Sequence, residues 1–531
     1  MPRISGGELL VKVLEKQGAE IIFSIPGGQL LGVYEAIRKS KSLKLLVPRQ
    51  EGASALMACG YALAGDGPGV VISTVGAGVI YELSGLYYAW LNRIPIISIA
   101  PQVQSWRIKP IQENLQALDQ DELFAPLTKF HSIIYHYSRL AQLLQRAYRI
   151  ALAPEPGPVH LDIPLDIAFE KRYLRARALA ELISDSEKTR FTGKMEPDSE
   201  ELKKAMKIFS EAKKPLALVG RGMARPGYGW AVEKFFSKNK VPALCSKAGF
   251  SSVPRKTGAF VAGLDFYQDG QGLDLIQESD LYILLEPDAE LGFFLEKINR
   301  THPQKPTIQI SNNPKGFYRF GAISSALAGS PDLILNHLCQ VSFAGKEQSL
   351  EKLIQHQAQI FKQVQAKVPE HRLNALAEIF SSINRILTDK DFVVVEGKEA
   401  VLCAQIYLEN YGSGRVILVS PPAPRGAGFP IALGIKARIK EAKVFLVSER
   451  KSFKVHSREL QTGFRYHLGI CSLVIAEEDK LRETEPDLAR LAKSLGVKGV
   501  SVQEPIEEIN EELLGEAFEL ESGLLLEIRG F

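Results

Sequence analysis

One glutamate in the first third of the chain is a candidate for proton transfer. Glu51 follows Arg49 and Gln50 and stands at the start of a helical pattern. A carboxyl group that is shielded from water has a raised pKa and can exchange a proton near neutral pH. The structural alternative is that the helix dipole favours an acidic residue in the first turn of a helix. Glu51 is therefore a catalytic candidate whose position alone leaves a structural role open.

Three cationic side chains in the last third of the chain could bind an anion. Arg450 and Lys451 follow the apolar run Val444–Val447, and Arg425 follows a turn that begins at Pro421. A guanidinium group pairs with a phosphate through two parallel hydrogen bonds, and an ammonium group adds a point charge. These residue types would suit a phosphorylated ligand such as a nucleotide or CoA.

Short apolar runs alternate with helical patterns along most of the sequence, and this alternation predicts doubly wound sheets. Their nearly continuous apolar character is typical of parallel strands buried on both faces. The runs are Glu20–Ser24, Val70–Thr74, Ile94–Ile99, Leu216–Val219, Leu281–Leu285, Phe392–Val395, Val416–Val419, Val444–Val447 and Ser472–Ile475. Charged segments at 170–200 and 345–371 divide the chain into three α/β domains, 1–175, 195–345 and 370–531. The second segment is expected to be an exposed helix that stops at Pro369.

The composition excludes several classes of function. The 531 residues include 65 Lys and Arg against 61 Asp and Glu, so a net charge of +4 gives no basic surface for nucleic acid. Five dispersed cysteines form no zinc-binding spacing and indicate a reducing compartment. No signal peptide is visible, and no apolar run approaches the ~20 residues that span a membrane. We expect a cytoplasmic protein without nucleic-acid or membrane partners, for which a small-molecule ligand is possible.

Four motifs near the N-terminus occur in an order that is typical of one enzyme family. They are Ile25-Pro26-Gly27-Gly28, Arg49-Gln50-Glu51, Thr74-Val75-Gly76-Ala77-Gly78 and Gly157-Pro158-Val159-His160-Leu161-Asp162-Ile163-Pro164. In this order they resemble the pyrimidine-binding domain of acetolactate synthase-like enzymes, which depend on thiamin diphosphate (ThDP). Further similar segments, such as Gly220-Arg221-Gly222 and Ser452-Phe453, extend the resemblance over the whole chain. It implies pyrimidine-type, central and diphosphate-type domains.

The resemblance also implies roles for individual residues. Glu51 corresponds to the buried glutamate that hydrogen-bonds the aminopyrimidine ring of the cofactor, and Gln112 is the second catalytic candidate. Gly27, Gly28 and Gly76 lie in turns where the backbone would approach the cofactor. In relatives the cofactor lies between the first domain of one subunit and the third domain of another. A homodimer or homotetramer is therefore implied.

The diphosphate-type domain departs from the family pattern. Relatives carry Gly-Asp-Gly-Ser-Phe after one strand and Asn-Asn after the next, and oxygen atoms from both motifs bind Mg²⁺. Here Glu449-Arg450-Lys451 and Ala476–Asp479 stand at these places, and an arginine cannot ligate a cation. Arg425 replaces an apolar residue that supports the cofactor, and only Lys480–Pro486 remains of a long loop. We therefore expect no metal site, and Mg²⁺ is not an expected cofactor.

The flavin site of some relatives is also not expected here. Those relatives bind FAD in the central domain with an arginine-containing stretch. The matching stretch, Leu285–Glu290, has three acids and no arginine, and acids near a diphosphate are unfavourable. ThDP thus remains implied by resemblance alone, and the cofactor is unknown from the residues themselves.

Three hypotheses for the function follow. The favoured one is a divergent homologue, non-catalytic or repurposed, in which Arg450 and Lys451 form a salt bridge with the acidic segment Glu477–Asp479 in place of the metal. The second is a metal-free binder of ThDP or another phosphorylated ligand through Arg425, Arg450 and Lys451. The third is a conventional ThDP-dependent decarboxylase or carboligase that acts on a 2-oxo acid such as pyruvate.

Overall fold

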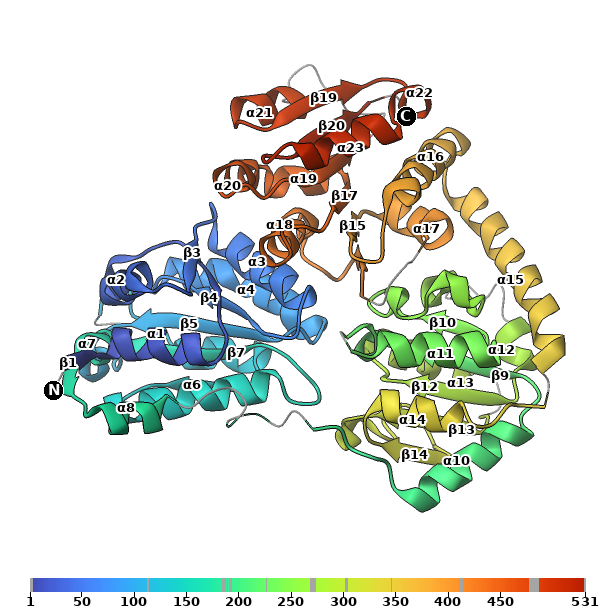
Figure 1. The fold of residues 1–531 in the computed structure, drawn as a ribbon, viewed down its shortest axis with the longest axis horizontal. Coiled ribbons are helices and arrows are strands. Elements are labelled where there is room, and N and C mark those ends of the chain that lie inside the picture. Colours follow the sequence, from blue (N-terminus) through green and yellow to red (C-terminus); the bar gives the residue numbers. More distant parts are fainter. Residues whose placement is uncertain are drawn as a thin grey trace.

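Three six-stranded sheets, each flanked by helices, make up the computed structural model of this chain (Figure 1). The structure describes residues 3–111, 114–183, 188, 190, 193–225, 227–267, 274–300, 304–344, 346–409, 414–476 and 487–529. Neighbouring strands within each of the three sheets run parallel. The expected α/β class with three parallel-sheet domains is confirmed.

The first sheet is built from short buried strands. Its order is β3 (Lys44–Leu46), β2 (Ile21–Ser24), β4 (Gly69–Ile72), β5 (Ile96–Gln102), β7 (Val159–Pro164) and β6 (His131–Ile133). Its helices are α1 (Gly6–Lys16), α2 (Leu31–Lys39), α3 (Glu51–Leu63), α4 (Ala77–Leu91), α5 (Gln120–Phe124), α6 (Tyr137–Ala151), α7 (Leu165–Phe169) and α8 (Ala176–Leu182). In β4 all four residues are buried and three are β-branched, which suits a strand that is covered on both faces. Two short strands, β1 (Arg3–Ser5) and β8 (Lys171–Tyr173), form a separate antiparallel pair.

The third sheet repeats the connectivity of the first. Its order is β16 (Val416–Val419), β15 (Phe392–Glu396), β17 (Val444–Glu449), β18 (Cys471–Ile475), β20 (Leu524–Ile528) and β19 (Lys498–Val502). Its helices are α16 (Glu370–Ile386), α17 (Lys398–Tyr407), α18 (Gly428–Arg438), α19 (Arg450–Val455), α20 (Leu460–Arg465), α21 (Leu488–Ser494), α22 (Pro505–Glu508) and α23 (Glu511–Glu519). In chain order both sheets follow the pattern 2-1-3-4-6-5. The first and third domains thus share one parallel-sheet topology.

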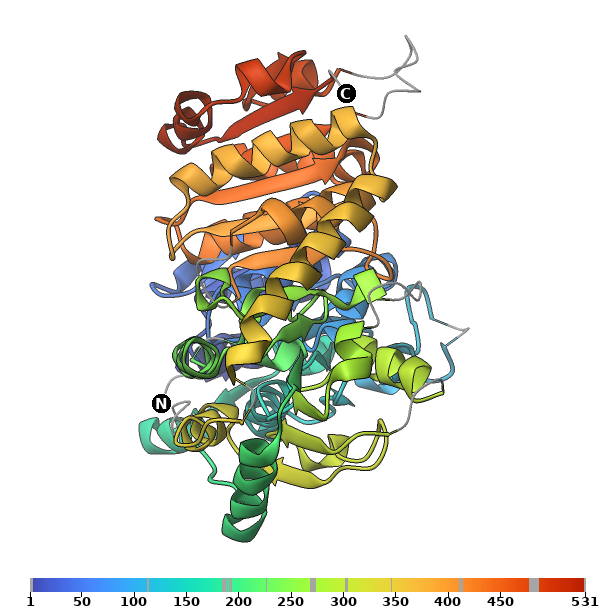
Figure 2. The ribbon, with the colours of Figure 1, turned by 90° about the vertical axis from the view of Figure 1, so that its right-hand side faces the viewer.

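The central sheet has a different order. It runs β11 (Phe260–Gly263), β10 (Ala243–Cys245), β9 (Pro215–Val219), β12 (Leu281–Leu285), β13 (Thr307–Ser311) and β14 (Ser325–Ala328). Its helices are α10 (Ser199–Glu211), α11 (Gly229–Asn239), α12 (Asp274–Glu278), α13 (Ala289–Asn299) and α14 (Pro331–Leu338). The predicted helix before Pro369 is confirmed as α15 (Lys346–Lys367), which runs along the outside of the molecule from the central sheet to α16 (Figure 2). Within the described residues, no helix has the length and apolar character that a membrane crossing requires.

Helices α3 and α18 join the first and third domains through a close crossing. A methyl group on Gly60 would overlap the carbonyl oxygen of Ile431, and one on Gly434 would overlap that of Met57. The two backbones therefore touch, and a larger residue at either glycine has no room. This contact between α3 and α18 fixes the carboxyl edge of the first sheet relative to that of the third sheet within one chain.

Replacing Gly434 with alanine is expected to lower the free energy of unfolding by about 1–3 kcal/mol, because the added methyl group forces α3 and α18 apart. Urea unfolding followed by circular dichroism measures the change. Gly515, in α23, is the matched control because a methyl group there meets no atom within 4 Å. Gly515→Ala is expected to stabilise the chain by about 0.5–1 kcal/mol. Equal effects of the two substitutions would contradict the close crossing.

Candidate functional site

Two glycine turns and the start of α3 meet at the carboxyl edge of the first sheet. Gly27 and Gly28 follow β2, and Gly76 follows β4 with a φ of 76° and caps the start of α4. A side chain at position 27 would overlap Thr74, so only glycine fits there. A methyl group on Gly78 would lie 3.3 Å from Oε1 of Glu51. The structure thus brings the predicted glycine turns and Glu51 together at one edge.

Glu51 is the first residue of α3, and the third domain helps to position it. The backbone N–H of Arg49 donates to Oε1 of Glu459 at 2.9 Å, and the backbone N–H of Val47 donates to the hydroxyl of Tyr466, also at 2.9 Å. Burial raises the pKa of Glu459 to about 6. In the single chain Glu51 itself is half-buried, so water reaches a carboxyl group that we expected to be shielded. The other catalytic candidate, Gln112, lies outside the described residues.

Arg450 lies at the corresponding edge of the third sheet, where it forms a buried ion pair. It is the first residue of α19, and its Nη1 pairs with Oε1 of Glu527 on β20. The exposed fractions of the two side chains are 6% and 0%. The other carboxylate oxygen of Glu527 accepts from Nη2 of Arg529 at 2.7 Å and from the backbone N–H of Leu488 at 3.1 Å. The Glu527 carboxylate thus ties the start of α19 to the start of α21.

Glu449 occupies the start of another helix. Its Oε1 accepts from the backbone N–H of Lys398, the first residue of α17, at 2.7 Å. Lys451 Nζ lies 3.2 Å from Oε2 of the same carboxylate. Gly397 has a φ of 124°, and a methyl group there would overlap the side chain of Glu449. The close approach of Glu449 therefore depends on glycine at position 397.

Glu396, at the end of β15, occupies the start of α18. Its side chain is 4% exposed, and its two oxygens accept from the backbone N–H groups of Gly426 at 2.7 Å and Gly428 at 3.1 Å. Burial raises the pKa of Glu396 to about 7; the two amides act in the opposite direction, and nearby Glu449 adds to the rise. Arg425, next to this cap, is exposed.

The helix starts at this edge are already engaged by the protein itself. Backbone N–H groups at the start of a helix bind anions, including phosphate. Here the amides of α17 and α18 donate to Glu449 and Glu396. In the part of the chain that the structure describes, no group of three or more His, Cys, Asp or Glu side chains could hold a metal ion. The acidic segment Glu477–Asp479 lies outside that part, so its pairing with Arg450 stays a prediction.

The comparisons with known proteins agree with this architecture. Residues 4–123 match the N-terminal TPP binding domain of thiamine pyrophosphate enzymes, and residues 202–338 match their central domain. The acetolactate synthase large subunit of Haemophilus influenzae is 24% identical to this chain over 99% of the chain and 94% of its own length. The isozyme 3 large subunit of Escherichia coli K12 is 23% identical over 98% and 93%. The chain belongs to the acetolactate synthase-like family of ThDP-dependent enzymes. A probable acetolactate synthase large subunit of Methanocaldococcus jannaschii, 25% identical over 96% of the chain and 89% of its own length, is another relative.

Within this family member, the two predicted groups of site residues stay apart. The glycine turns and Glu51 lie on the first sheet, and Arg425, Arg450 and Lys451 lie on the third. Among the described residues, no hydrogen bond or ion pair links Glu51 to any of the three cations.

Two acidic residues at this edge were missed by the sequence reasoning. Glu527 lies in β20, whose other four residues are apolar, and Glu396 directly follows the predicted strand Phe392–Val395. An acid inside or at the end of a buried strand must find hydrogen-bond donors or a cation. That requirement was a signal that each carboxylate has a fixed partner, although the sequence does not say which one.

Proposed function

We propose that this member of the acetolactate synthase-like family does not hold Mg²⁺-ThDP in the family manner and is non-catalytic or repurposed. The observation that carries the proposal is the buried ion pair between Arg450 and Glu527. Arg450 stands where relatives have a metal-ligating aspartate, and its guanidinium group is held by a protein carboxylate. A cation at this position repels a second cation and offers no ligand.

The residues around Arg450 do not fit a magnesium ion bridging to a diphosphate. Glu396 and Glu449 take the helix amides that a diphosphate would need. A diphosphate that displaced them would lie beside two carboxyl groups. Each carboxyl group that is charged would repel the diphosphate. The protein's own carboxyl groups thus accept the hydrogen bonds of the helix amides at this edge.

One observation favours a second candidate, the metal-free binding of ThDP or another phosphorylated ligand. Arg425 is exposed next to the start of α18 and forms no ion pair with the described residues. Its guanidinium group is free to pair with a phosphate.

We also propose the homodimer or homotetramer that the family resemblance implies. Light scattering on the purified chain would test it.

Calorimetric titration of the full chain with ThDP, with and without Mg²⁺, tests the proposal. We expect no saturable binding up to about 1 mM, which corresponds to about −4 kcal/mol, and no acetolactate from pyruvate. Magnesium-dependent binding with acetolactate formation that Glu51→Gln abolishes would restore the conventional enzyme. Metal-independent binding that Arg425→Gln removes, while Arg149→Gln on α6 leaves it unchanged, would establish the second candidate.

A further inference from the structure

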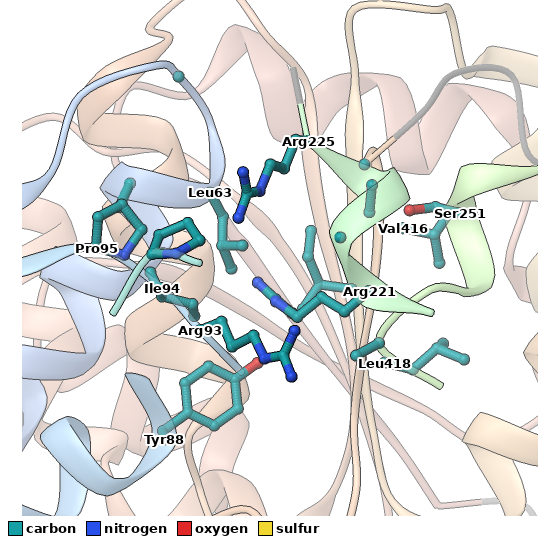
Figure 3. A pocket seen from close by; sticks show the side chains of 18 of the residues that line it. Leu63, Tyr88, Arg93, Ile94, Pro95, Arg221, Arg225, Ser251, Val416 and Leu418 are labelled. Carbon is teal, nitrogen blue, oxygen red and sulfur yellow. The ribbon is translucent and has the colours of Figure 1, made fainter. Parts of the chain in front are cut away.

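A cavity of about 220 Å³ lies where the three domains meet, away from the edge that carries Arg450 (Figure 3). The first domain contributes Leu63 at the end of α3 and the segment Arg93–Pro95. The central domain contributes the short helix η5 (Arg221–Ala224) and Arg225. The third domain contributes one edge strand, β16.

Three arginines point toward one another in this cavity (Figure 3). They are Arg93, Arg221 and Arg225. Arg93 Nη2 pairs with Oε1 of Glu155 at 2.8 Å. Arg221 Nη1 donates to Oδ1 of Asn92 at 3.4 Å, and Arg225 Nη2 donates to the carbonyl oxygen of Pro154 at 2.5 Å. Neutral oxygens thus hold two of the guanidinium groups in place and leave their charge uncompensated by direct contact.

The acids near the cavity do not neutralise Arg221 and Arg225 by contact. Within the described residues neither arginine forms an ion pair. Asp288 accepts from the backbone N–H of Arg221, and Glu290 pairs with Lys247 at 3.0 Å. Glu286 is buried, and burial raises its pKa, while Arg225 lowers it. Burial likewise lowers the pKa of Arg221, as expected for a cation that lacks a close counter-ion.

We propose that this cavity binds a small organic acid whose carboxylate or phosphate group lies between the guanidinium groups of Arg221 and Arg225. Planar guanidinium groups pair with either anion through two parallel hydrogen bonds. Leu63, Ile94 and Leu418 supply apolar walls for a compact body next to the anionic group (Figure 3). The volume lies below the roughly 300–1,000 Å³ of sites for drug-sized ligands, which suits a compact ligand.

Titration of the full chain with three probes of one shape tests the proposal: benzoate, phenyl phosphate and the neutral benzyl alcohol. We expect at least one of the two anions to bind saturably and benzyl alcohol not to bind. Benzoate alone would identify a carboxylate ligand, and phenyl phosphate alone a phosphorylated one. Arg221→Gln is expected to weaken binding of the anion at least about tenfold. Arg149 is exposed, and Arg149→Gln is expected to leave the affinity unchanged.

A second variant keeps both charges and fills the space instead. Ala224, in η5, lines the cavity, and Ala224→Leu is expected to weaken the same anion by a similar factor. Absence of binding by either anion would overturn the proposal. Affinity that survives Arg221→Gln or Ala224→Leu, or equal binding of benzyl alcohol, would also overturn it. The test is independent of ThDP, because Arg221 and Ala224 lie in the central domain and Arg425 lies in the third.

Discussion

Replacing Arg450 with methionine is expected to lower the free energy of unfolding by about 3–5 kcal/mol, the range for breaking a buried ion pair from one side. The substitution leaves the carboxylate of Glu527, which has no exposed surface, without its arginine partner on α19. The amide of Leu488 and the guanidinium group of Arg529 remain as donors and set the lower end of the range. Urea unfolding followed by circular dichroism measures the loss.

A double-mutant cycle separates the ion pair from general damage to the core. Glu527→Gln removes the charge and keeps an acceptor for the amide of Leu488, so Arg450→Met with Glu527→Gln leaves no unpaired buried charge. We expect the double variant to be at least about 1.5 kcal/mol more stable than the sum of the single losses predicts. Lys451→Met is the matched control, because its half-exposed pair with Glu449 contributes about 1 kcal/mol or less. A loss in Arg450→Met no greater than in this control would contradict a stabilising pair.

Replacing Arg450 with aspartate is expected to destabilise the chain more than replacing it with methionine. Arg450→Asp would set a carboxylate beside the buried Glu527, and like charges in a buried site repel strongly. The variant is therefore expected to melt at a lower temperature than Arg450→Met, in a thermal scan at neutral pH. An aspartate at position 450 would thus replace the buried ion pair with two facing carboxylates, because Glu527 lies on the opposite side.

The sequence predicted the sheets well because their strands are buried on both faces. The runs Leu281–Leu285 and Val416–Val419 coincide with β12 and β16, and each consists of apolar residues, as is typical of a strand covered on both faces. Boundaries were less accurate where a polar residue ends a strand: the run predicted at Glu20–Ser24 begins one residue later, at Ile21, in β2. Short strands such as β10 were not predicted, because three residues show no periodicity.

The sequence predicted the positions of the candidate site residues but not the residues with which they interact. Local motifs identified the turns at Gly27, where a side chain would overlap Thr74, and at Gly76, whose φ of 76° favours glycine. The partner of Arg450 could not be predicted in this way. Glu527 lies on β20, two strands away in the sheet from β17, and only the sheet order brings it to the start of α19. The expected partner, the acidic segment Glu477–Asp479, lies outside the described residues.

The free energy of unfolding of the wild type, minus that of Glu396→Gln, is expected to fall by about 2–3 kcal/mol between pH 5 and pH 8. The pKa of Glu396 is raised from its ordinary value of 4.5 to about 7, chiefly by burial. Between these two values the folded chain holds a proton that the unfolded chain has released, so unfolding releases that proton and rising pH favours it. The contribution is complete below the unfolded pKa and is lost as the pH rises through the folded one.

Urea unfolding of both proteins at several pH values measures this difference, and Glu519→Gln, an exposed position in the last turn of α23, is the control. Parallel stability curves for wild type and Glu396→Gln would show that Glu396 ionises in the folded chain as it does in the unfolded one. Absolute stabilities carry less information, because glutamine offers one acceptor to the two amides of Gly426 and Gly428.

A proton held by Glu396 near neutrality also reduces its repulsion with Glu449, which contributes to the raised pKa. Deprotonation above pH 7 adds a negative charge at this edge of the third sheet, so an anionic ligand there would bind more weakly as the pH rises.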